Sequence, residues 1–501
     1  LNTLEEVLDY VQAKYVDTVN VSNLQNTAIS DVLEQLDPHS TFIPAKDLTS
    51  VNQELEGNFE GIGIEFFVVA DTISVVSVIS GGPAEQVGVQ LGDKIITIND
   101  TTFSGKHVED LNVVNHLRGP KGSKVNIQVK RKGVPNLLSF TITRDKIPMY
   151  SIDASYMIDA TTGYIKINRF SETTYDEFMA ALKKLKESGM KRLVIDLRQN
   201  GGGLLNSATD VIDELLDQDK LMVYTKGRVY SRLDYKTRVQ GEFEDGPLAI
   251  LIDEGTASAS EIVAGAIQDW DRGVIVGRRS FGKGLVQEQY GLSDGSALRL
   301  TVAKYYTPSG RCIQKPYDHN INDYYGEVLN RYHNGEELNA DSIHLNDTMK
   351  YFTSKGRVVF GGGGIIPDVF VPLDTSNNTN AFLNAVLNQG LIQQFSYSWY
   401  QNHQSALSGF SSLDQYRLDF SVSDDLYNEF LNYAAKNTIS GSDQQKDHAR
   451  NFISLRIKAF LAREKFSADA FYSVINDDDP VLHQAILSLN KDVTAFNWGR
   501  K

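Results

Sequence analysis

The order of hydrophobic and polar positions changes character several times along the chain. In residues 1–57, apolar residues such as Leu4, Val7 and Leu8 recur at helical spacing and predict a small helical region. Residues 58–147 consist of short β-rich runs separated by glycines, with one helix-like piece in the second half. We expect a helical lead-in followed by a compact β domain.

Strand and helix patterns alternate in the next region, residues 148–375. Apolar runs such as RLVIDLR and LAILID are separated by amphipathic segments, which is typical of a mostly parallel sheet covered by helices. Ligand sites in such sheets lie beyond the carboxyl ends of the strands. Residues 376–501 return to amphipathic helical patterns without a recognisable chemical motif. The fold class is therefore a multidomain α/β protein with an inserted β domain and helical regions at both ends.

Composition excludes several classes of protein. A chain of 501 residues is too long for one core, and its net charge of −15 argues against nucleic acid as the main partner. No run approaches the roughly eighteen apolar residues that span a bilayer. The sequence begins inside a helical pattern, so we expect an export signal or anchor to lie outside it. Cys312 is the only cysteine, so no internal disulfide forms, and its surroundings contain no activating motif.

A first motif that could carry out chemistry, GTASASEIVAG, follows the predicted strand LAILID. It places Thr256, Ser258 and Ser260 at a strand-to-helix turn. A hydroxyl there lies beside backbone N–H groups and the positive end of a helix, which favours a developing oxyanion. The same residue types are also ordinary helix caps. Periodicity does not choose between Ser258 and Ser260 as a nucleophile.

A second block, FGKGLVQEQY, could supply a base for such a nucleophile. Lys283 stands between two glycines, and a lysine acts as a base when burial lowers its pKa from about 10.4 toward 7 or 8. That shift costs the folded state about 4 kcal/mol of stability. A lysine at such a position is therefore not explained by a structural role alone. Gln287 could orient the amine by a hydrogen bond without adding a charge.

Three other chemistries are disfavoured by the same residues. Gly277, Gly282 and Lys283 fit part of a phosphate-binding loop, but Gly284 replaces the hydroxyl residue and a strand follows where a helix is required. None of the nine histidines lies at a Gly-rich strand end, which argues against a Ser-His-Asp triad. No HExxH or paired Cys/His spacing occurs. We therefore predict no metal and no cofactor.

A third block, DLRQNGGG at 196–203, closes the strand RLVIDLR. Glycines at that point let backbone amides approach a substrate oxygen, although a tight turn alone would also require them. Asp196 and Arg198 are more typical of structural charges than of catalytic groups.

The β domain resembles a PDZ domain. The match consists of Gly61, Ile62, Gly63 and Ile64 before a strand, and of the later run SGGPAEQVGVQLGDKIITIND. The resemblance implies that an extended peptide adds a strand to the sheet edge while the loop binds its terminal carboxylate. Arg118 follows the expected groove helix and is a candidate relay to catalysis. An Arg118 substitution that changed neither peptide affinity nor activation would remove that role. A domain that only spaces its neighbours is the alternative.

Together, GTASASEIVAG, FGKGLVQ and DLRQNGGG resemble the signature blocks of C-terminal-processing (tail-specific) serine peptidases. The resemblance extends over about residues 1–372 and includes LDPHSTF at 36–42. It implies that residues 148–375 form a serine peptidase core, and it assigns roles to individual residues. Those roles are nucleophile for Ser258, base for Lys283, orienting third member for Gln287, and oxyanion hole for the amides of Ala259 and either Gly202 or Gly203.

The resemblance also implies substrates and a setting. We expect an endopeptidase that cleaves proteins with accessible C-termini in the periplasm or cell envelope of a bacterium. A homo-oligomer or an adaptor protein is left open. The rival hypotheses are a PDZ peptide-binding scaffold with a silent or latent peptidase core, and an acyl-thioester enzyme on a related core. Ser258 and Lys283 are both present, which disfavours the scaffold.

Overall fold

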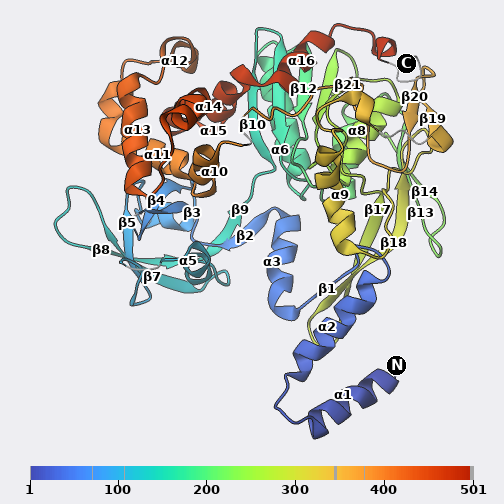
Figure 1. Ribbon diagram of the computed structural model, residues 1–501, viewed down its shortest axis with the longest axis horizontal. Helices are drawn as coiled ribbons and strands as arrows, with labels where there is room; N and C mark the ends of the chain where they lie inside the picture. Colours follow the sequence, from blue (N-terminus) through green and yellow to red (C-terminus); the bar gives the residue numbers. More distant parts are fainter. Residues whose placement is uncertain (1, 70, 106–107, 344–346, 377–378, 497–501) are drawn as a thin grey trace. The chain divides into compact units, whose positions relative to one another are not determined.

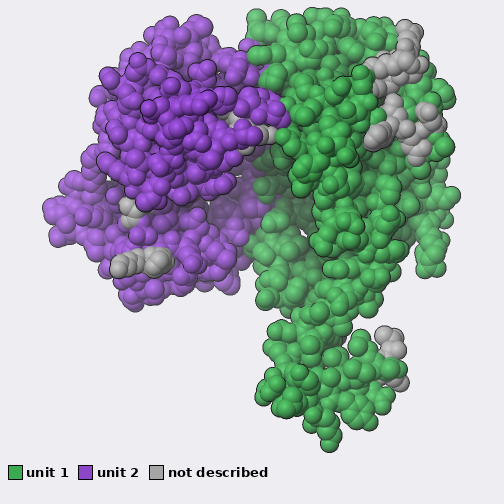
Figure 2. Space-filling model, viewed as in Figure 1, with its two compact units in different colours: residues 1–56, 159–373, 480–501 green, residues 57–158, 374–479 purple. Residues whose placement is uncertain are grey.

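A computed structural model describes residues 2–69, 71–105, 108–343, 347–376 and 379–496. The chain forms two compact units, each assembled from segments that are distant in sequence (Figure 2). Unit 1 comprises residues 1–56, 159–373 and 480–501. Unit 2 comprises residues 57–158 and 374–479. The β-rich segment and most of the C-terminal helices therefore belong to the same unit.

The core of unit 1 contains parallel strands covered by helices (Figure 1). Five of these strands follow one another in the order β11 (Thr162–Ile167), β12 (Arg192–Asp196), β15 (Leu248–Ile252), β16 (Val274–Gly277) and β21 (Val369–Phe370). The intervening helices include α6 (Thr174–Glu187), α7 (Leu205–Asp213) and α8 (Ala259–Asp269). β15 is buried along its whole length, as expected for an apolar strand covered on both faces. The predicted alternation of strands and helices is confirmed.

An antiparallel sheet completes the part of unit 1 that concerns the site. Its strands are β1 (Thr41–Ile43), β13 (Leu221–Lys226), β14 (Leu233–Lys236), β17 (Leu285–Gly291) and β18 (Ala297–Tyr306). β18 pairs with β1, β13 and β17, so it joins the N-terminal segment to the hairpin that follows the predicted base. Further elements of unit 1 are α1 (Asn2–Lys14), α2 (Val21–Glu34), α3 (Ala45–Glu56), α9 (Ile321–His333), β19 (Lys350–Phe352), β20 (Val358–Phe360) and α16 (Pro480–Ser488).

The β domain of unit 2 is a sheet in the order β3-β4-β5-β7-β8, with β6 on β5 and a separate β2–β9 pair. Its elements are β2 (Asn58–Gly61), β3 (Ile64–Val69), β4 (Thr72–Val78), α4 (Pro83–Gln86), β5 (Lys94–Ile98), β6 (Thr101–Thr102), α5 (Asp110–Leu117), β7 (Lys124–Lys130), β8 (Leu138–Thr143) and β9 (Asp145–Pro148). β7 alternates exposed and buried residues along its length, so only one face packs on the core. β3 lies at an edge of the sheet.

Helices form the other part of unit 2. They are α10 (Ala381–Asn388), α11 (Leu391–His403), α12 (Leu413–Asp419), α13 (Asp424–Lys436), α14 (Asp443–Lys465) and α15 (Ala468–Ile475), and strand β10 (Ile152–Met157) contacts α15. Their shared apolar core includes Phe395, Phe430 and Ile457. The Tyr397 hydroxyl on α11 donates to the Val75 carbonyl on β4 at 2.7 Å and joins the helices to the sheet. No helix within the described residues is long and apolar enough to span a membrane. The predicted multidomain α/β fold with helical end regions is confirmed.

Candidate active site

The turn between β15 and α8 contains the three candidate hydroxyl groups, and the structure distinguishes them by their exposure and hydrogen bonds. Ser258 caps α8 with φ 57° and ψ −117°, a conformation that non-glycine residues rarely adopt. Its side chain is partly exposed, whereas Thr256 and Ser260 are fully buried. Thr256 Oγ1 donates to the Leu197 carbonyl at 2.9 Å, and Ser260 Oγ donates to the Asn200 carbonyl at 3.0 Å. Ser258 is therefore the hydroxyl of this turn that a substrate can reach.

Glu261 ties this turn to the segment that carries the predicted base. Its fully buried carboxylate accepts hydrogen bonds from the backbone N–H groups of Ser258 (2.9 Å), Lys283 (2.8 Å) and Gly282 (2.8 Å), and from the Ser280 hydroxyl. Burial raises the pKa of Glu261 to about 7 against the opposing effect of these bonds. No local sequence pattern indicates this role, because Ser280, Gly282 and Lys283 lie 19 to 22 residues further along the chain.

Tyr305 on β18 makes a second link between the same two segments. Its buried hydroxyl lies 3.1 Å from the Ser258 carbonyl oxygen and also contacts the Lys283 carbonyl oxygen. Burial raises the pKa of Tyr305 well above its ordinary value, so the group stays a protonated donor. Glu261 and Tyr305 together hold the backbones of Ser258 and Lys283 close to each other.

Lys283 has the environment that a neutral amine requires. Burial, aided by the charge of Arg299, lowers the pKa of Lys283 below its ordinary value, although the charges of Glu261 and Asp37 act in the opposite direction. Within the described residues its Nζ has neither a hydrogen-bond partner nor an ion-pair partner. In particular, it makes no hydrogen bond to the Ser258 hydroxyl. Catalytic hydrogen bonds are often loose before substrate binds.

Gln287 lies on β17 next to a β-bulge at Val286, and such a bulge re-aims a side chain. Its Nε2 donates to Thr301 Oγ1 on β18 at 3.1 Å, and Thr301 Oγ1 donates to Asp37 Oδ1 at 3.0 Å. Gln287 has no hydrogen bond to Lys283 among the described residues, so its orienting role stays a prediction.

The segment LDPHSTF thus enters the site through Asp37. Its carboxylate accepts the N–H groups of His39 (2.8 Å) and Ser40 (2.9 Å), and the Ser40 hydroxyl at 2.6 Å. Burial lowers the pKa of His39 to about 3, so its ring is neutral near pH 7. The fixed turn presents Asp37 to Thr301, a contact across 264 residues that no local sequence pattern reveals.

Thr301→Val tests this connection, because valine keeps the shape and the strand preference of threonine but removes both hydrogen bonds. We expect kcat to fall about tenfold with little change in KM, since Gln287 loses its anchor while the substrate contacts remain. Steady-state kinetics on an unfolded protein substrate measures this. Thr301→Ser, which keeps the hydroxyl, should retain most of the activity. Wild-type kcat in Thr301→Val would exclude a positioning role.

The glycine run approaches the Ser258 turn closely. A Cβ on Gly202, whose φ is +100°, would lie 2.7 Å from Cβ of Ser258 and 2.9 Å from the nitrogen of Ala259. The Gly202 N–H donates to Asn200 Oδ1 at 2.9 Å, whereas the N–H groups of Gly203 and Ala259 have no partner in the described chain. Of the two predicted glycines, Gly203 therefore keeps the free amide.

Asn200 holds the glycine run against this turn. Its carbonyl oxygen accepts the Ala257 N–H at 3.0 Å, and its Nδ2 donates to the Ile167 carbonyl at 3.0 Å. Asp196 is buried and bound to Arg198 and Lys166. Burial would raise the pKa of Asp196, but these two cations hold it below its usual value. The ion pairs of Asp196 at the end of β12 therefore stabilise the turn that precedes the glycines.

The loop before β3 contains the predicted carboxylate site. The N–H groups of Ile62 and Gly63 have no partner in the described part of unit 2, although both residues are buried. Gly61 ends β2 and Ile64 begins β3. Arg118 follows α5 and places its guanidinium 4.6 Å from the centre of the Phe59 ring, also within unit 2. Its role as a relay stays a prediction.

Other reactive groups offer no competing site in the described residues. Burial raises the pKa of the Cys312 thiol, which disfavours the nucleophilic thiolate. No group of three or more His, Cys, Asp or Glu side chains there is arranged to hold a metal ion.

Comparison with known proteins matches three parts of the chain. A model of peptidase family S41 matches residues 161–322, a PDZ domain model matches 61–142, and a model of a family of unknown function matches 382–467. A carboxy-terminal-processing protease of Bartonella bacilliformis is 37% identical over 62% of this chain and 71% of its own length. The carboxy-terminal processing protease CtpB of Bacillus subtilis is 35% identical over 63% of this chain and 66% of its own length. A solved photosystem II D1 C-terminal processing protease is 31% identical over 61% of this chain and 82% of its own, with a TM-score of 0.35.

The α/β core, the PDZ domain and the two carboxy-terminal-processing proteases define the class as a PDZ-bearing peptidase. A probable CtpA-like serine protease of Staphylococcus aureus, 33% identical over 62% of this chain and 62% of its own length, supports a serine peptidase. The chain belongs to peptidase family S41, among the carboxy-terminal-processing proteases. The predicted resemblance is confirmed.

Proposed function

We propose that this chain is a serine endopeptidase that cleaves proteins near their C-termini, with Ser258 as nucleophile and Lys283 as general base. The observation that carries the proposal is the amine of Lys283, which has no partner among the described residues and whose pKa is lowered by burial. Glu261 and Tyr305 join its segment to the strained, accessible Ser258 turn. A structural lysine would be expected to pair with an acceptor, since an isolated buried amine costs stability.

The proposed reaction is acyl transfer to Ser258. Neutral Lys283 takes the proton from the Ser258 hydroxyl as the oxygen attacks the peptide carbonyl, and the protonated amine then donates to the leaving nitrogen. The N–H groups of Ala259 and Gly203, which have no acceptor among the described residues, bind the tetrahedral oxyanion. Water then hydrolyses the acyl-enzyme with Lys283 again as base. Gln287 would help to orient the amine once substrate closes the site.

The PDZ domain is proposed to bind the C-terminal peptide of the substrate. β3 is an edge strand, so its outer backbone groups can pair with an added strand. The loop that leads into it offers to a carboxylate the N–H groups of Ile62 and Gly63, for which the described part of unit 2 holds no acceptor. The proposed partners are therefore proteins with accessible, extended C-termini. A bacterial cell-envelope setting, an oligomer or adaptor, and the domain boundaries stay predictions. The relatives from Bartonella and Bacillus are bacterial proteins.

A pair of matched substrates tests both parts of the proposal. One is an unfolded protein with a nonpolar C-terminus and a free carboxylate, and the other is the same protein with an amidated terminus. We expect mass spectrometry to show cleavage near the C-terminus, with kcat/KM at least about tenfold lower for the amide, because a hydrogen-bonded charge contributes about 1.5–3 kcal/mol.

The outcomes separate the two parts. Equal cleavage of both substrates would remove carboxylate binding from the proposal but leave the peptidase intact. Binding of the peptide without any cleavage would instead favour a PDZ scaffold with a silent or latent core.

A further inference from the structure

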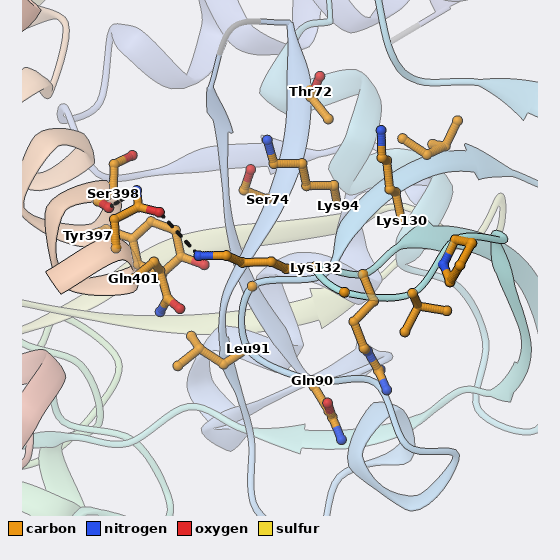
Figure 3. Close-up of a pocket in the computed structure, with 17 residues that line it drawn as sticks. Thr72, Ser74, Gln90, Leu91, Lys94, Lys130, Lys132, Tyr397, Ser398 and Gln401 are labelled. Atoms are coloured by element: carbon orange, nitrogen blue, oxygen red, sulfur yellow. Dashed lines mark hydrogen bonds between the residues drawn. The ribbon is translucent and has the colours of Figure 1, made fainter. Parts of the chain in front are cut away.

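A basic cavity of about 950 Å³ lies within unit 2, between the PDZ sheet and helix α11 (Figure 3). The PDZ domain contributes residues from β4, β5, the end of β7, the β7–β8 connection and the loop before β5, and α11 contributes Tyr397, Ser398, Gln401 and Asn402. It does not include β3 or the loop at 61–64, so it is separate from the proposed peptide-binding edge. Neither the fold class nor the proposed peptidase chemistry gives this cavity a role.

Positive charge is concentrated in this cavity. Lys94, Lys130, Arg131 and Lys132 line it, and no carboxylate is among its lining residues, although the whole chain has a net charge of −15. Arg131 is already neutralised by Asp93, with both of its nitrogen–oxygen distances at 2.7 Å. The three lysines are therefore the available cations.

Two of these lysines occupy an unfavourable arrangement in the sheet. Lys94 on β5 is the direct register partner of Lys130 on β7, and Ser74 on β4 is the partner of Lys94 on its other side. Like charges at directly opposed positions destabilise a sheet. Both side chains are exposed, and no other described residue forms an ion pair with either of them. A bound anion would offset this repulsion.

Gln401 supplies a second and independent indication. The residue lines the cavity, and its buried Nε2 has no hydrogen-bond partner within the described part of unit 2. A buried donor without an acceptor costs about 1–3 kcal/mol, so an anionic oxygen placed there would satisfy it. In Figure 3, Gln401 and Tyr397 lie on the helix side of the cavity, and Lys94 and Lys130 lie on the sheet side.

We propose that this cavity binds a ligand that carries two or more phosphate groups, either as a free compound or as a lipid headgroup. Lysine ammonium groups suit compact phosphates as point charges, whereas planar carboxylates favour the guanidinium fork, which Asp93 occupies here. The volume exceeds what a single phosphate fills, and Lys132 borders the cavity on the α11 side through a 3.3 Å hydrogen bond to Asn402 Oδ1.

Calorimetric titration of the full chain with inorganic tripolyphosphate at low salt tests the proposal. We expect saturable binding of one molecule, weakened about tenfold by Lys94→Gln and about a hundredfold by Lys94→Gln combined with Lys130→Gln. Gln401→Leu should weaken it about fivefold without changing the charge. Lys124→Gln is the matched control, because Lys124 is an exposed lysine on the same strand but outside the cavity. It should change the affinity less than about twofold.

Additional binding experiments distinguish a free phosphate compound from a lipid headgroup. If vesicles that contain phosphatidylinositol phosphates bind, and soluble tripolyphosphate competes, the headgroup is the ligand; binding of tripolyphosphate alone identifies a free compound. Without ligand, the Tm of Lys130→Gln should equal or exceed that of wild type, because repulsion is removed. The proposal is overturned if neither probe binds, or if Lys124→Gln weakens binding as much as Lys94→Gln.

Discussion

Ser258→Ala is expected to lower kcat by at least about 10⁴-fold while leaving the free energy of unfolding at or above that of wild type. The loss follows from the proposed role of Ser258, because deletion of a serine nucleophile in a hydrolase typically costs 10⁴ to 10⁶ in rate. Stability should not fall, since the Ser258 side chain is partly exposed and the Glu261 contact uses its backbone N–H. Mass spectrometry of the products and thermal unfolding measure the two effects.

Ser260→Ala is the matched control two residues away. The Ser260 hydroxyl donates to the buried Asn200 carbonyl, so its removal should lower the free energy of unfolding by about 1 kcal/mol and keep activity within about tenfold. The opposite pattern, with Ser258→Ala active and Ser260→Ala inactive, would move the nucleophile to Ser260 and contradict the assignment.

Local sequence patterns predicted the features that depend on neighbouring residues. The buried run LAILI became β15, and the small residues after it became the turn at Ser258 and helix α8. The run LVQEQY became β17, as the argument against a phosphate-binding loop required. Each of these outcomes follows from hydrophobic period, glycine placement and helix-start residues, which act over a few positions.

The remaining parts of the site depend on contacts between distant segments. Glu261 is one turn into α8 and looks like a capping residue, yet its carboxylate organises the backbone around Lys283. The sequence around Thr301 predicts an ordinary strand residue, but its hydroxyl forms hydrogen bonds with both Gln287 and Asp37. The choice of Gly203 over Gly202 rests on which amide Asn200 Oδ1 accepts. Sequence spacing carries no information about such pairings, because the fold alone brings these residues together.

Lys283→Met is expected to remove at least about 10³-fold in kcat and to make the protein more stable near pH 7. Methionine fills a similar volume without a charge, and loss of a general base costs 10² to 10⁴. Burial lowers the folded-state pKa of Lys283 below its unfolded value of about 10.4. Between these two pKa values the unfolded chain binds more protons, so wild-type stability rises with pH across that window. The stability advantage of Lys283→Met should therefore shrink as pH rises toward about 10.4.

A second buried lysine provides the control for this argument. Burial lowers the pKa of Lys315 to about 8, but its Nζ donates to the Tyr324 carbonyl at 2.8 Å and pairs with Glu327 at 3.1 Å. Lys315→Met should therefore destabilise the protein, because it leaves buried acceptors without a donor. If Lys283 is the base, kcat/KM of the wild type rises with pH as its amine loses a proton, and this rise persists in Lys315→Met. A rise that disappears in Lys315→Met, or a Lys283→Met variant that retains activity, would assign the titration to another group and remove Lys283 as the base.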